Sequence, residues 1–298
     1  MPLTSVVDYL NSSLQQLHPQ ARLRDLSQLS FDHGRLSAQI AGFQLQPYQV
    51  PVATLVEPPE RIIGRSGQFR LTGVNGRHAR PESIYVHAWD SHDVVFLDRF
   101  LRTMHALFHI SQEHSPEELL VLPVHLRHVS ALSERHGQVF EGLLSQLGLS
   151  PRQVVLRLQG RALQDDPHVQ QAAQSFITCG YRLAAVLNSG PHNDPATIRW
   201  PVLRNSGISW ISPDQALLQH WQEQDGFDLW RDAAKVHGIG LWLTGIDSAA
   251  TPPRSALAAE DILEGDRFLV AANGQRLDPG HSDRDMPGNA ARSLSTYR

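Results

Sequence analysis

From residue 94 onward, short apolar runs alternate with longer segments whose apolar residues recur at helical spacing. Residues 94–110 have this spacing and predict an amphipathic helix. The residues on its apolar face are Phe96, Phe100, Met104 and Phe108. Residues 119–124 are apolar almost throughout, which is typical of a strand buried on both faces. This region therefore begins with a helix followed by a buried strand.

The same alternation continues toward the C-terminus. Further strand-like runs are residues 154–159, 182–187, 207–212, 239–245 and 267–272. Helical patterns are residues 129–148, 166–180, 215–238 (one or two helices) and 255–265. Such alternation predicts a parallel sheet with helical crossovers. So many units within 298 residues favour a closed α/β barrel over an open doubly wound sheet.

The two ends of the chain are less regular. Residues 6–29 have apolar positions at helical spacing and predict a helical segment. Residues 35–55 alternate in a strand-like way and predict an opening strand or hairpin. The polar segment from about residue 275, rich in Pro, Gly and Ser, predicts a flexible tail.

Composition narrows the function classes. The chain is 41% hydrophobic and 19% charged, with a net charge of −4. Without a basic excess, direct nucleic-acid binding is not expected. The N-terminus lacks the pattern of a secretory signal, and no apolar run approaches the ~20 residues that span a bilayer. We therefore expect a cytoplasmic protein without a membrane span.

The residues that usually bind metals or act as nucleophiles are sparse or scattered. Cys179 is the single cysteine, which excludes an intrachain disulfide, and we interpret it as core filler in preference to a nucleophile. His105 and His109, four residues apart, share a helical face. Two histidines without a third ligand favour partly exposed structural residues, with a metal site as the alternative. No cofactor is expected.

A series of degraded motifs follows in a fixed order. Residues 43–54 (FQLQPYQVPVAT) resemble an opening strand with a YQP-type segment, and residues 61–71 (RIIGRSGQFRL) lie where a Glu-Ala-Leu signature belongs. Next, LVLPVHLRHVS resembles a strand ending in Asn, QVVLRLQGRAL a strand bearing Glu-x-x-Glu, and RLAAVLNSGP a strand ending in Asp-Asp-Phe-Gly. After these, ISWISPDQAL resembles a Lys-Ile-Asp strand, GIGLWLTGIDS a strand ending in Ala-Glu-Gly-Val-Glu, and AAEDILEGDRFL a closing Asp-x-x-Gln-Gly segment.

No single motif is specific, but in this order residues 36–277 resemble the EAL domain family, the cyclic di-GMP phosphodiesterases. The resemblance implies an α/β fold, an EAL-type modified TIM (β/α)8 barrel with an antiparallel opening strand. An N-terminal helical extension over residues 1–35 would precede it, and a flexible tail over residues 278–298 would follow it.

Active members of that family hold Mg²⁺ or Mn²⁺ on carboxylates and an asparagine at the strand ends, and these ligand types are replaced here. Hard cations require such oxygen ligands. The positions that correspond to the family's site are Ser66, His125, Arg157, Gly160, Val186, Leu187, Trp210, Ser212 and Thr244, with Glu264 in the closing segment. The resemblance therefore implies a degenerate, catalytically inactive member with no metal.

Three functions stay open on these residues. The first is a regulatory protein-interaction module in cyclic di-GMP signalling, with a protein partner and, by resemblance, a homodimer as an option. The second is a receptor that binds cyclic di-GMP without hydrolysis, through Arg70, Gln68 and Arg157, because guanidinium groups suit phosphate contacts. The third is an α/β barrel unrelated to this signalling, which a parallel opening strand would favour. Metal-dependent hydrolysis is the least favoured reading.

Overall fold

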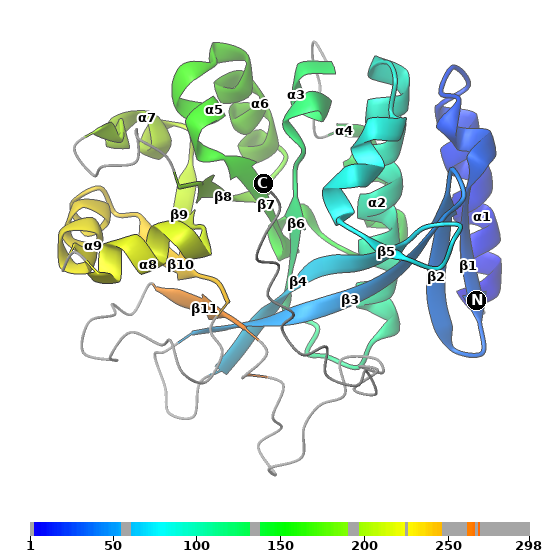
Figure 1. Cartoon of the computed structure of the whole chain (residues 1–298), viewed down its shortest axis with the longest axis horizontal. Coiled ribbons are helices and arrows are strands. Elements are labelled where there is room, and N and C mark those ends of the chain that lie inside the picture. Colours follow the sequence, from blue (N-terminus) through cyan, green and yellow to red (C-terminus); the bar gives the residue numbers. More distant parts are fainter. Residues whose placement is uncertain are drawn as a thin grey trace, which may run out of the picture.

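A closed barrel of eight strands forms the centre of the computed structural model, which describes residues 3–54, 61–131, 138–189, 197–223, 226–245, 261–265 and 268 (Figure 1). The barrel strands are β3 (Phe43–Thr54), β4 (Arg61–Thr72), β6 (Leu119–Pro123), β7 (Val154–Gln159), β8 (Arg182–Leu187), β9 (Ile208–Pro213), β10 (Gly240–Leu243) and β11 (Ile262–Glu264). Pairing of β3 with both β4 and β11 closes the barrel.

The direction of the opening strand is the distinguishing feature of this barrel. β3 runs antiparallel to β4 and to β11, whereas the other neighbouring barrel strands are parallel. The predicted fold class, an EAL-type barrel with an antiparallel opening strand, is confirmed. The parallel opening strand that would have favoured an unrelated barrel is not observed.

Helices connect the parallel strands on the outside of the barrel. They are α2 (Ser91–Ser111), α3 (Leu126–Ala131), α4 (Gln138–Gln146), α5 (Gly160–Asp165), α6 (Pro167–Thr178), α7 (Trp200–Asn205), α8 (Gln215–Glu223) and α9 (Phe227–Val236). The sequence pattern predicted α2, α4, α6, α8 and α9. It missed α5 and α7, because six residues are too few for helical periodicity to show. Within the described ranges, no helix has the length and apolar content needed to cross a membrane.

The N-terminal segment corrects one prediction. Helix α1 (Leu3–Leu17) overlaps the first part of the predicted helical region, residues 6–29, but a 3-10 turn, η1 (Leu23–Leu26), and strand β1 (Ser27–Asp32) follow it. β1 forms a hairpin with β2 (Arg35–Ile40), and β2 pairs with β3. The predicted N-terminal helical segment is present as α1, but the helical prediction for residues 27–29 is wrong, because alternating burial along β1 matches a sheet packed against α1.

The C-terminal part of the barrel corrects another prediction. The predicted helix over residues 255–265 contains strand β11, whose three residues are all buried. Pairing with β10 and β3 fixes this short strand, and a three-residue run carries no periodicity of its own. The predicted strand at residues 267–272, apart from Phe268, and the predicted tail at residues 278–298 lie outside the described residues.

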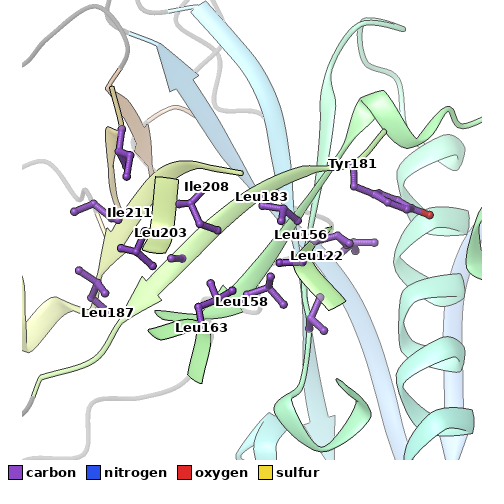
Figure 2. Close-up of a cluster of buried hydrophobic side chains, with 14 of the residues drawn as sticks. Leu122, Leu156, Leu158, Leu163, Tyr181, Leu183, Leu187, Leu203, Ile208 and Ile211 are labelled. Atoms are coloured by element: carbon purple, nitrogen blue, oxygen red, sulfur yellow. The ribbon is translucent and has the colours of Figure 1, made fainter. Parts of the chain in front are cut away.

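Among the described residues, three apolar clusters hold the fold together. The first lies between the outer faces of β6–β9 and the surrounding helices, where Leu156, Leu183 and Ile211 meet Leu163 of α5 and Leu203 of α7 (Figure 2). The second joins α1 and α2 to the hairpin strands. The third fills the lumen of the barrel around Val52, Val121, Val155 and Trp242.

A buried carboxylate joins the N-terminal segment to the barrel. Asp93, in the first turn of α2, has no exposed surface. Its Oδ1 accepts hydrogen bonds from the backbone N–H groups of Arg22 (2.7 Å) and Leu23 (3.0 Å), and its Oδ2 accepts one from Trp89 N–H (3.4 Å). The start of η1 is thus fixed to the start of α2 by one side chain.

Candidate functional site at the carboxyl ends of the strands

The lumen near the carboxyl ends of the strands is closed by an ion pair. Arg157 on β7 donates from Nη1 to Glu264 Oε2 on β11 (3.1 Å) and from Nη2 to Ser212 Oγ on β9 (2.7 Å). The Glu264 side chain is 3% exposed and that of Arg157 is 15% exposed. Three positions from the sequence analysis therefore meet in one hydrogen-bonded group across the barrel. Arg157 is therefore paired with a carboxylate of the barrel itself.

Two tryptophans pack below this ion pair. Trp242 on β10 donates from its indole N–H to Glu264 Oε2 (2.9 Å), and the Arg157 guanidinium lies 4.9 Å from the centre of its ring. Trp210 on β9 meets Trp242 edge to face, at 5.9 Å between ring centres and 86°. A cation over an indole gains further electrostatic attraction where water is excluded. The lumen is thus filled by side chains at this level.

Gln68 and Arg70 lie on β4 and share one neighbour on β3. Tyr48 donates its hydroxyl to Gln68 Oε1 (2.7 Å), and the Arg70 guanidinium lies 5.2 Å from the centre of the Tyr48 ring. Both side chains are half-buried. Ser66, on the same face of β4, is buried. The structure brings Gln68 and Arg70 together around Tyr48 but, among the contacts of the described residues, does not join them to Arg157.

The remaining predicted site positions are dispersed around the rim. His125, after β6, stacks on Tyr85 with 3.7 Å between ring centres, and burial lowers its pKa. Gly160 begins α5, where an added Cβ would lie 2.7 Å from a Leu187 methyl group. Val186 is half-buried on β8, and Thr244 is half-buried just beyond β10. Leu187 belongs to the core outside the barrel.

His105 and His109 are buried, not partly exposed as the sequence predicted, because α2 packs directly on the barrel. His105 is 2% exposed and faces Gly67, where an added Cβ would lie 2.9 Å from its ring. His109 is 1% exposed and its Nδ1 lies 3.0 Å from the side-chain nitrogen of Gln49. Within the described ranges, no three His, Cys, Asp or Glu side chains gather as a metal site would require.

Acid is expected to destabilise the protein through these histidines. Burial lowers the pKa of His105 and of His18 to about 4 and that of His109 to about 3, from 6.5. Between pH 6.5 and 4 the unfolded chain binds more protons than the folded chain, so stability falls as pH decreases through this window. The urea midpoint should therefore drop steeply between pH 7 and 4.5.

Two variants test whether His105 contributes to this fall of the urea midpoint in acid. His105→Leu should flatten the dependence of the midpoint on pH, whereas His78→Gln, at an exposed position, should leave it unchanged. Equal slopes in the wild type and His105→Leu would show that His105 does not contribute.

Cys179 is half-buried at the end of α6 and packs against the main core, as predicted. Burial and the nearby Glu141 carboxylate raise the pKa of its thiol. A raised pKa lowers the thiolate fraction, which is the reactive form. This environment fits core filler and does not favour a nucleophile.

Sequence reasoning missed three residues of the site. Tyr48 and Trp242 contact predicted positions from the neighbouring strand, and Tyr85 contacts His125 from the turn η2 (Pro81–His87). A signal for Trp242 was present, since it lies two residues before Thr244 and thus on the same face of its strand. Tyr48 and Tyr85 carried no comparable signal, because their partners are distant in sequence.

Comparison with solved structures identifies the fold. The EAL domain of FimX from Pseudomonas aeruginosa, bound to c-di-GMP, has a TM-score of 0.57 at 14% identity, covering 76% of this chain and 90% of that one. The PaMucR phosphodiesterase in complex with c-di-GMP has a TM-score of 0.56 at 12% identity, covering 85% and 94%. A standalone EAL protein from Vibrio cholerae, bound to c-di-GMP, has a TM-score of 0.56 at 11% identity, covering 75% and 90%.

These similarities establish an EAL-like fold for the chain. At sequence level, no family model and no curated protein matches it.

Proposed function

We propose that this chain is a catalytically inactive EAL-like protein that acts as a regulatory protein-interaction module in or near cyclic di-GMP signalling. The observation that carries the proposal is the ion pair of Arg157 with Glu264 inside the barrel. A divalent cation such as Mg²⁺ needs several oxygen ligands. Here the buried carboxylate already accepts from Arg157 and Trp242, so the residues present do not fit a metal.

Apolar surface beside the same end of the barrel supports the interaction role. Val86 and Trp89 are 76% and 78% exposed, and Leu126 is 38% exposed. Arg127, next to Leu126, holds the segment that carries Val86 and Trp89 in place by donating to the backbone carbonyls of Tyr85 (2.8 Å) and Ala88 (2.7 Å). Large apolar side chains held rigidly in water are typical of protein interaction sites.

Hydrolysis is tested directly by incubating the purified protein with cyclic di-GMP and Mn²⁺ and separating the products by chromatography. We expect no linear dinucleotide, with PaMucR as the active control, since it is a phosphodiesterase of the same fold. The proposal would be contradicted if the wild type formed the linear dinucleotide and the Arg157→Met variant did not.

The interaction role is tested by photocrosslinking from position 86 or 89 in the cells that make the protein. Discrete cross-linked protein species are expected from these positions and not from position 229, because Leu229 on α9 is 62% exposed but lies elsewhere on the barrel. A species at twice the mass of the chain would identify a homodimer. Equal or absent cross-linking at all three positions would refute a docking surface here.

A non-hydrolysing cyclic di-GMP receptor is the second candidate. Arg70 favours it, because this residue is half-exposed and its guanidinium has no carboxylate within 4.0 Å in the part of the chain that the structure describes. Calorimetric titration distinguishes the two. Micromolar binding that survives chelation and is lost in Arg70→Ala, but not in the exposed Arg77→Ala, would establish the receptor. If no heat of binding is measured at high cyclic di-GMP concentration, the receptor is rejected and the interaction module is retained.

A further inference from the structure

A cavity of about 670 Å³ lies at the opposite end of the barrel, where the parallel strands begin. The first residues of β8, β9 and β10 line it: Arg182, Ile208 and Gly240. Thr54, at the end of the antiparallel β3, also lines it. Its volume lies within the range of small-molecule sites, ~300–1,000 Å³. The Trp210–Trp242 pair and the ion pair of Arg157 with Glu264 lie between this cavity and the other end of the lumen.

One wall of this cavity is apolar and aromatic. Ile63 and Ile262 contribute aliphatic side chains, and Trp210 is half-buried beside them. The edge-to-face contact with Trp242 holds the Trp210 ring on its inner side. A flat apolar molecule would find a fixed surface here.

Two guanidinium groups add positive charge to this cavity. Arg182 is exposed, and neither it nor Arg204 has an acidic side chain within 4.0 Å among the residues that the structure places. The nearby carboxylate of Asp261 does not line the cavity and accepts from Leu241 N–H (2.7 Å). Among the described residues, the lining thus carries two positive charges and no negative one.

Arg204 is also held in place before any ligand arrives. Its Nη1 donates to the backbone carbonyls of His237 (2.7 Å) and Gly238 (3.1 Å). Gly238 has a positive φ of 62°, and a Cβ there would collide with the Arg204 guanidinium. A glycine in the left-handed region therefore makes room for this arginine, which lowers the entropy cost of binding an anion.

We propose that this cavity binds a small anion with a flat apolar body, such as an aromatic carboxylate, independently of the opposite end of the barrel. The apolar body packs on Trp210, and the carboxylate lies between the guanidinium groups of Arg182 and Arg204. Charge-assisted hydrogen bonds from arginine suit a carboxylate in this position.

Calorimetric titration with 2-naphthoate tests the proposal, with 2-naphthalenemethanol as the neutral counterpart. We expect one equivalent of naphthoate to bind and the alcohol to bind far more weakly. Arg182→Gln should raise the Kd about tenfold, since one charge-assisted contact is lost. Arg35→Gln, at an exposed position on the N-terminal hairpin, should leave the Kd unchanged.

Several results would overturn the assignment. These are no saturable heat at millimolar naphthoate, equal binding of the alcohol, or equal effects of Arg182→Gln and Arg35→Gln. Loss of binding in Arg70→Ala would place the anion at the carboxyl ends instead. Thermal melts of each variant show whether it is folded. Because cyclic di-GMP takes no part in the titration, its outcome is independent of the proposed function.

Discussion

Replacing Arg157 with methionine is expected to lower the free energy of unfolding by about 3 kcal/mol, as measured by urea denaturation at pH 7. The change leaves the Glu264 carboxylate, 3% exposed, inside the barrel without its guanidinium partner. It also removes the cation that lies over the Trp242 ring and the hydrogen bond that Arg157 donates to Ser212 Oγ. Leaving one charge of a buried pair alone costs more than the pair itself contributes.

The double variant Arg157→Met, Glu264→Gln separates charge from packing. We expect it to recover much of the lost stability, because an uncharged amide has a far smaller desolvation penalty than a carboxylate. Arg161→Met is the matched control, since its ion pair with Asp165 is exposed and should contribute less than about 1 kcal/mol. A single variant as stable as the wild type would show that Arg157 does not neutralise Glu264.

Replacing Asp93 with alanine is expected to cost about 3 kcal/mol and to loosen the N-terminal segment. The buried N–H groups of Arg22 and Leu23 would lose their acceptor, and the segment would lose its attachment to α2. Limited proteolysis should then cleave the chain faster between α1 and β1, because local opening there becomes easier. Urea denaturation gives the stability change.

Asp93→Asn tests the role of the individual oxygen atoms. Its single carbonyl oxygen can still accept from Arg22 and Leu23, while the contact with Trp89 N–H is lost, so we expect a cost of about 1 kcal/mol. Asp32→Ala, at an exposed position in the hairpin, should change stability by less than about 0.5 kcal/mol. If Asp93→Ala lowers the free energy of unfolding no more than Asp32→Ala does, Asp93 does not attach the N-terminal segment to α2.

The candidate site was partly predictable. The order of strands placed Arg157, Ser212 and Glu264 near one another, since residues at the ends of neighbouring parallel strands lie on one rim. Trp210, predicted for the same rim, faces the cavity at the opposite end of the barrel. The ion pair was not predictable, because Arg157 and Glu264 are 107 residues apart and meet only when the barrel closes. The burial of His105 was missed because it depends on Gly67 of β4 allowing α2 to approach.

The sequence by itself determined the fold class and the order of its parts. Apolar runs and helical spacing reflect which faces are buried, and such local patterns persist even where every motif is degraded. Tertiary structure alone decided that residues 27–32 form a strand and that residues 262–264 close the barrel, because both depend on pairing with distant strands. It also decided which charges meet, since contacts across a lumen join residues that no local pattern relates.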